Sequence, residues 1–138
     1  MSQMMFVNIP VTDLPRARAF YVGLGFSINE MFSDDTAACV VISEANYLMI
    51  LTREKFASFS TLPVGDPSRT CAVLIALALD DKPAVDRFAA AALAHGGSEP
   101  KPVSDLGFMY QRTIADPDGN TFEPFWMDPA AAGGGPPE

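Results

Sequence analysis

Length, composition and charge exclude several classes of protein. The chain has 138 residues, 49% hydrophobic and 19% charged, which is enough for one folded domain with a substantial core. Nine basic against seventeen acidic residues give a formal net charge of −8, which disfavours nucleic acid and anionic membranes as partners. No apolar run reaches the roughly eighteen residues of a spanning helix, and the start MSQMMFVNIPV lacks the basic segment of a signal peptide. We therefore expect a cytoplasmic protein.

The first half of the chain begins with the segment FVNIPVTDLPRARAFYVGLGF, residues 6–26. Its apolar start predicts a strand that ends at Asp13, an N-capping residue, and Pro15 suits the first turn of a helix. Gly23 and Gly25 predict the end of that helix. Strand patterns then follow at about 26–32, 36–43 and 46–52.

The segment 53–70 is polar, contains Pro and Ser, and is predicted to connect two halves of the chain. It also contains three bulky apolar residues, Phe56, Phe59 and Leu62. Such a segment could cover the mouth of a cleft as a lid. Alternatively, it is a surface loop pinned to the core by its two phenylalanines.

The second half of the chain repeats the first. A shift of 68 positions places Asp13 on Asp81, Pro15 on Pro83 and Phe20 on Phe88. Strand patterns again follow the helix, at about 98–104, 107–115 and 120–127. The repeat predicts two βαβββ modules, at about 4–52 and 71–128, within a single domain of residues 1–128. The low-complexity tail, 129–138, is predicted to be disordered.

The stretch DPDGNTFEPFW, residues 116–126, places a carboxylate inside a strand pattern. The letters DPDG predict a tight turn, and the alternation after it puts Glu123 on one face together with Thr121 and Phe125. Because a lone buried charge is costly, Glu123 is a candidate functional residue.

Two βαβββ halves, with VTDLPRARAFYVGLGF near the start and DPDGNTFEPFW near the end, resemble the vicinal oxygen chelate superfamily. This superfamily includes glyoxalase I, bleomycin-resistance proteins, fosfomycin-resistance thiol transferases and extradiol dioxygenases. The resemblance implies an α+β fold in which two modules form curled sheets around a cleft. In such proteins the cleft holds a divalent metal through His, Gln or Glu from the first and last strands of each module.

The ligand positions that this resemblance implies carry mostly unsuitable side chains here. They fall on Phe6, Met49, Leu74 and Glu123. Only Glu123 is an ordinary ligand for Zn²⁺, Ni²⁺, Mn²⁺ or Fe²⁺. The sequence therefore predicts no metal cofactor, and leaves weak binding of a divalent metal open. Glu123 is then a hydrogen-bond acceptor or a candidate general base.

Other residues are expected to line the same pocket. Asn8 and Thr113 follow from the resemblance, and strand alternation adds a further three, Tyr47, Met109 and Gln111. Together with Phe6, Met49 and Leu74, these form the predicted substrate-binding set. Asn8, Gln111 and Thr113 are the expected hydrogen-bond partners of Glu123. Arg112 falls on the opposite face and is expected to be a solvated charge.

The histidine and the cysteines are not expected to do chemistry. His95 ends the second helix, where it would contact the last carbonyl groups. Cys39 and Cys71 stand singly in apolar runs and are expected to be reduced, buried thiols.

Three functions remain open. The first is a glyoxalase/bleomycin-resistance-like protein that binds a small molecule in the module cleft without a metal, and this is the function we favour. The second is a metal-dependent lyase, thiol transferase or dioxygenase with non-standard ligands, and the third is a non-catalytic structural or interaction module. Whether the protein is an enzyme is left open. We also expect a homodimer, because curled sheets of this kind leave open edges.

Overall fold

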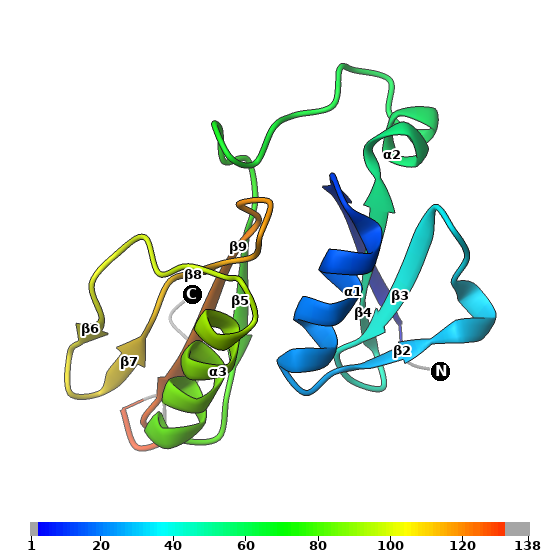
Figure 1. The fold of residues 1–138 in the computed structure, drawn as a ribbon. Coiled ribbons are helices and arrows are strands. Elements are labelled where there is room, and N and C mark those ends of the chain that lie inside the picture. Colours follow the sequence, from blue (N-terminus) through cyan, green and yellow to red (C-terminus); the bar gives the residue numbers. More distant parts are fainter. Residues whose placement is uncertain (1–2, 132–138) are drawn as a thin grey trace. The chain divides into compact units, whose positions relative to one another are not determined.

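The chain divides into two compact units, Met1–Thr70 and Cys71–Glu138 (Figure 1). The structure, a computed structural model, describes residues 3–131. Module one and the connector fall in the first unit, and module two falls in the second. Of the predicted disordered tail, residues 132–138 lie outside the described residues, and residues 129–131 form a turn.

The first unit is a four-stranded sheet with a helix against one face (Figure 1). The strand order is β1-β4-β3-β2, in which β1 runs parallel to β4 and the other neighbours are antiparallel. Its elements, in chain order, are β1 (Met5–Val11), α1 (Leu14–Gly23), β2 (Ser27–Asn29), the 3₁₀ helix η1 (Glu30–Phe32), β3 (Ala37–Val41), β4 (Asn46–Thr52) and α2 (Arg53–Phe59).

The second unit repeats this plan with shorter strands. Its strand order is β5-β9-β7-β6, with β5 parallel to β9 and β8 paired with β9. Its elements are β5 (Leu74–Ala78), α3 (Lys82–Ala94), β6 (Ser104–Asp105), β7 (Met109–Gln111), β8 (Ile114–Ala115) and β9 (Thr121–Met127). The predicted α+β fold is confirmed.

Helices α1 and α3 begin and end in the same way. The carboxylates of Asp13 and Asp81 accept hydrogen bonds from the backbone N–H groups of Arg16 and Ala84, at 3.0 Å and 2.8 Å. These bonds satisfy N–H groups that have no partner inside a helix. Both helices then close with a glycine at positive φ, Gly25 (103°) and Gly96 (97°), where a side chain would be strained.

The core of each unit lies between the helix and one face of its sheet. In the first unit Phe20 and Tyr21 of α1 are fully buried, and they pack edge to face with ring centroids 4.9 Å apart. They cover the strand residues that alternate toward the helix, such as Ile9 and Ile50. In the second unit Phe88 of α3 is buried in the same role as Phe20, as the repeat predicts.

Four details of secondary structure differ from the sequence prediction. The strand predicted at 26–32 ends at Asn29 and is followed by the 3₁₀ helix η1. The connector 53–70 contains a helix, α2, because Thr52 caps it by accepting a hydrogen bond from the Lys55 N–H. The strand predicted at 98–104 is reduced to a bridge at Ser98 and to β6. The strand predicted at 107–115 is divided into β7 and β8.

Candidate functional site

Four of the predicted site residues lie on the face of the first sheet that points away from α1, which we call the open face. On β1, Phe6 and Asn8 are exposed whereas Ile9 and Val11 are buried against the core. The ladder sets Phe6 opposite Tyr47 and Asn8 opposite Met49, so all four side chains share the open face. The rings of Phe6 and Tyr47 stack, with centroids 4.6 Å apart and planes 12° from parallel.

The equivalent open face of the second sheet carries the remaining predicted residues. Leu74 lies opposite Thr121, and Ala76 lies opposite Glu123. Met109 and Gln111 pair with alternate residues of β9 and therefore share this face. Thr113 is buried between β7 and β8, and because both short strands follow one register along β9, it falls across from Glu123.

Glu123 has one of its predicted partners. The Gln111 side chain donates a hydrogen bond from Nε2 to Oε2 of Glu123 at 3.2 Å, within the second unit. The carboxylate is half-buried between the small side chain of Ala76 and the neighbouring strands. A fixed amide donor of this kind holds the carboxylate in place and leaves its second oxygen for a ligand. A contact between Glu123 and Asn8 stays a prediction.

The donor set does not fit a divalent metal of the kind that the fold implies. Met49 is the structural counterpart of Glu123, since Met49 lies beside Asn8 of β1 and Glu123 lies beside Ala76 of β5 in the same register. The other two family positions, Phe6 and Leu74, are hydrocarbon side chains that stand half-exposed on their strands. Such a site needs three or four protein donors, and these positions supply one carboxylate and one thioether.

A pocket of about 470 Å³ lies on the open face of the first unit, beneath α2. Asn8 and Leu51 form its floor, and Phe56, Phe59 and Ser60 form its cover. The sequence singled out Asn8 and the two phenylalanines, but not Leu51 or Ser60. Two sequence signals could have indicated them. Leu51 stands two residues after Met49 and so shares its face of the strand. Thr52 is a capping residue, which indicates the helix that Ser60 follows.

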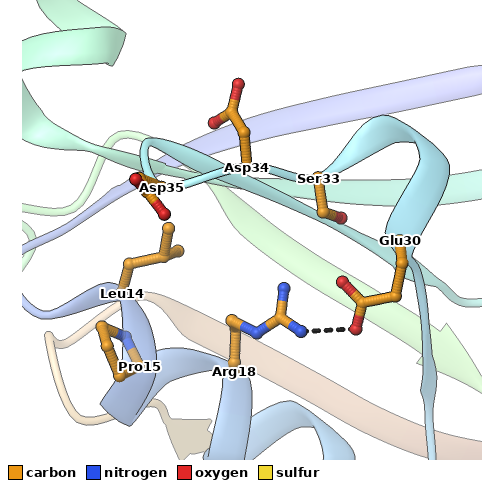
Figure 2. A pocket seen from close by; sticks show the side chains of 7 residues that line it. All are labelled: Leu14, Pro15, Arg18, Glu30, Ser33, Asp34 and Asp35. Atoms are coloured by element: carbon orange, nitrogen blue, oxygen red, sulfur yellow. Dashed lines mark hydrogen bonds and ion pairs between the residues drawn. The ribbon is translucent and has the colours of Figure 1, made fainter.

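A second hollow, of about 460 Å³, lies beside the N-terminus of α1 (Figure 2). Its wall holds Asp34 and Asp35, together with Glu30, which forms an ion pair with Arg18. The carboxylate of Asp34 accepts hydrogen bonds from the backbone N–H and the hydroxyl group of Thr36, within its own loop. These bonds lower the pKa of the Asp34 carboxyl group. This hollow includes no residue of the predicted site.

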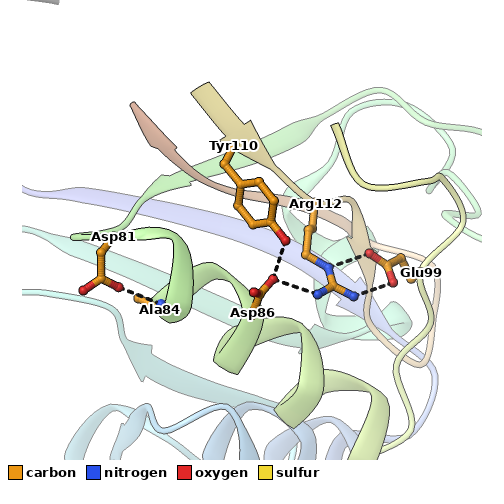
Figure 3. Close-up of polar contacts among 6 residues, drawn as sticks. All are labelled: Asp81, Ala84, Asp86, Glu99, Tyr110 and Arg112. Carbon is orange, nitrogen blue, oxygen red and sulfur yellow. Dashed lines mark hydrogen bonds and ion pairs between the residues drawn. The ribbon is translucent and has the colours of Figure 1, made fainter. Parts of the chain in front are cut away.

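Arg112 is ion-paired rather than solvated, which corrects the prediction. It lies just after β7 and on the side of α3, as alternation predicts, and it donates to both carboxylate oxygens of Glu99 at 2.8 Å and to Asp86 of α3 at 2.9 Å (Figure 3). The Tyr110 hydroxyl also donates to Asp86, at 2.6 Å. These bonds lower the pKa of Asp86, chiefly through Tyr110, and that of Glu99, chiefly through Arg112. The network ties α3 to β7, the strand that carries Gln111.

The histidine lies where the sequence predicts, and one cysteine does not. His95 Nδ1 lies 2.7 Å from the carbonyl oxygen of Ala91, in the last turn of α3. Cys39 is buried, and burial raises the pKa of its thiol. The prediction that Cys71 is buried is wrong, because Cys71 precedes β5 at the start of the second unit and is exposed.

Comparisons with known proteins concern the first part of the sequence and the fold. Residues 3–43 match the family described as bleomycin resistance protein-like N-terminal. A search of curated proteins finds no match. Among the described residues, no helix is both long and apolar enough to cross a membrane.

Several solved structures share the fold. A glyoxalase/bleomycin resistance protein/dioxygenase family enzyme from Burkholderia phytofirmans PsJN is 22% identical, with a TM-score of 0.74, over 91% of this chain and 99% of that one. A glyoxalase-related enzyme from Fulvimarina pelagi is 19% identical, with a TM-score of 0.76, over 91% and 88%. TnmS3, an antibiotic binding protein from Streptomyces sp. CB03234, is 22% identical, with a TM-score of 0.65, over 93% and 98%.

These likenesses, at under 25% identity, concern the fold, whereas the match over residues 3–43 concerns the sequence itself. The two agree, and they agree with the motifs at both ends of the chain. The chain has the fold of the glyoxalase/bleomycin-resistance/dioxygenase structures, and the sequence match over residues 3–43 supports the predicted resemblance to the vicinal oxygen chelate superfamily.

Proposed function

We propose that this protein binds a small, largely apolar molecule on the open faces of its sheets, without needing a bound metal. The observation that carries the proposal is the absence of charge on the open face of the first unit. Strands β1, β3 and β4 place only uncharged side chains there: Phe6, Asn8, Pro10, Ala37, Cys39, Val41, Tyr47, Met49 and Leu51. Ala37, Cys39 and Leu51 are buried, so the accessible part of this uncharged face includes Phe6, Asn8, Tyr47 and Met49. Small-molecule sites are likewise mostly apolar with a few polar groups.

The stacked rings of Phe6 and Tyr47 favour an aromatic ligand. Phe6 remains 47% exposed although it is stacked on Tyr47, so the pair offers ring surface to a third aromatic group. Aromatic pairs contribute about 0.5–1.5 kcal/mol beyond the burial of their area. TnmS3, which shares the fold, is named an antibiotic binding protein, and this supports a small-molecule ligand in general.

On the open face of the second unit, Glu123 and Gln111 supply a polar group that a ligand bound there can use. The carboxylate, held by Gln111, can accept a hydrogen bond from an N–H or O–H group of the ligand. It is also the group that would remove a proton if the ligand were transformed after binding. Binding itself requires only the acceptor.

Ligand-observed NMR with a panel of uncharged aromatic compounds tests this function. Compounds that bind the wild-type protein should bind Tyr47→Ala about tenfold more weakly, because the variant loses the stack. Leu93→Ala is the control. Leu93 is 47% exposed, as Phe6 is, but it lies on α3 in the second unit. A panel with no saturable binder, or binding that Tyr47→Ala leaves unchanged, would contradict the proposal.

A further inference from the structure

Helix α2 is held over the open face of the first unit without being packed into the core. It follows β4 directly, contacts β1 and β4, and has no fully buried side chain. A helix of seven residues is not stable by itself and depends on its tertiary contacts. Elements with few buried apolar contacts open at low free-energy cost. α2 is therefore the part of this unit best suited to move.

The space beneath α2 has the size and lining of a ligand site. Its volume of about 470 Å³ lies within the range of roughly 300–1,000 Å³ typical of small-molecule pockets. Leu51 is fully buried in its floor, whereas Phe59 remains 67% exposed in its cover. An aromatic side chain left this exposed would gain burial if the pocket were filled.

Arg53 fastens the loop that follows the helix. Its guanidinium donates to the carbonyl oxygens of Gly65 at 2.8 Å and Val64 at 3.2 Å, which folds the segment after α2 back toward its first turn. Ser60 closes the intervening bend by donating to the Leu62 carbonyl oxygen at 2.6 Å. The cover of the pocket is thus one closed loop with a single basic clasp.

We propose that α2 and residues 60–65 form a lid, clasped by Arg53, over a pocket in the first unit that takes the uncharged aromatic or apolar end of a ligand. This inference rests on the proposed function and specifies which part of the molecule performs it. The two Arg53 hydrogen bonds join the two ends of the lid and keep it in one piece, and the lid would open by lifting α2 off β1 and β4 and close by placing Phe56 and Phe59 over the ligand.

The lining decides the ligand's chemistry. No side chain that lines the pocket is charged, so an ionic group inside it would lose its hydration without gaining a partner from the lining. The nearby ammonium group of Lys55 lies 5.2 Å from the centre of the Phe59 ring and is not part of the lining. Among the described residues, Asn8 makes one long hydrogen bond, from Nδ2 to the Phe6 carbonyl oxygen at 3.4 Å. Its carboxamide oxygen can therefore accept a hydrogen bond from the ligand. The pocket fits a neutral, mainly aromatic group with one N–H or O–H donor.

The neutral fluorophore N-phenyl-1-naphthylamine, two aromatic systems joined by one N–H, tests the lid directly. Its fluorescence should rise in a saturable way with the wild-type protein. Phe56→Ala should weaken its binding about tenfold, and Phe56→Leu, which keeps an apolar side chain, should weaken it less. Arg53→Met should speed dissociation severalfold, because the clasp is lost while the apolar stem remains. Ala57→Ser, on the exposed side of α2, is the control and should bind as the wild type does.

Hydrogen exchange, measured by mass spectrometry on the same samples, should show slower exchange across 53–60 when the probe is bound. Unchanged binding in Phe56→Ala and Arg53→Met, together with weaker binding in Tyr47→Ala, would overturn the lid and leave the proposed function standing. No saturable binding by the wild type would overturn both. Protection of 53–60 that rises with protein concentration and not with probe would mean that a second copy covers the pocket, which also overturns the lid.

Discussion

Met49 and Glu123 occupy the same position in the two modules. Met49 lies beside Asn8 on the open face of the first sheet, and Glu123 lies beside Ala76 on the open face of the second. One position is therefore a soft thioether and the other a carboxylate. The two modules therefore share a backbone register at this position, but the chemistry of the side chain differs between them.

This difference in chemistry predicts the protein's behaviour toward metals. Titration calorimetry with Zn²⁺, Ni²⁺, Mn²⁺ and Fe²⁺ should give dissociation constants weaker than about a micromolar, because one carboxylate cannot complete a coordination sphere. Stoichiometric metal in protein purified without chelator, lost in Glu123→Ala, would contradict the prediction.

The Arg112 network predicts how stability depends on pH. Because the pKa values of Asp86 and Glu99 lie below their usual 3.8 and 4.5, the network stabilises the fold fully above about pH 5. This contribution is lost as the pH falls through the lowered folded-state values. Arg112→Met should reduce the free energy of unfolding at pH 7 by about 2 kcal/mol and flatten its acid dependence. Most of the loss should come from Glu99, since the Asp86 side chain is 51% exposed and is screened by water.

Urea denaturation at several pH values measures this effect. Arg18→Met is the matched control, because the Arg18–Glu30 pair is more exposed and its loss should cost less than about 1 kcal/mol. Equal losses in both variants at pH 7, or an unchanged acid limb in Arg112→Met, would show that the network does not stabilise the fold in this way.

The two aspartate caps should contribute equally to stability. Asp13→Ala and Asp81→Ala each remove one capping bond from an equivalent helix and should each cost about 1 kcal/mol in urea denaturation. The corresponding changes to Asn should cost little, because Asn also accepts from the helix N–H groups. Asp80→Ala, one residue before the second cap, is the control. A loss at Asp80 as large as at Asp81 would point to charge rather than capping.

Exposed sheet edges predict self-association. β1 and β5 end their respective sheets, and Met5, Phe6 and Leu74 on them are about half-exposed or more. Unpaired strand edges with apolar side chains need cover. We expect sedimentation velocity at tens of micromolar to show a homodimer that Met5→Lys weakens. A monomer at that concentration would contradict the expectation.

Local signals explain what could be predicted from the sequence. An Asp before an apolar helix, a Pro in the first turn and a Gly after the last turn act within a few residues of one another, so Asp13, Asp81 and Gly25 have the predicted roles. The 68-residue repeat then transfers the Asp cap and the Pro of the first turn from one module to the other, but not the glycine, because α3 is longer than α1. Strand alternation also puts Glu123 and Gln111 on one face, because a period of two residues does not depend on distant contacts.

Only the tertiary structure decided the partners of the other groups. Arg112 pairs with Glu99 and Asp86, which are 13 and 26 residues away in the chain. Strand alternation therefore predicted the face on which Arg112 lies but not its ion pairs. Cys71 stands in an apolar run, yet it precedes the strand and remains exposed. The pocket beneath α2 exists because Thr52 starts a helix that turns back over β1 and β4. Contacts between segments far apart in the chain leave no periodic pattern in the sequence, which is why these features could not be read from it.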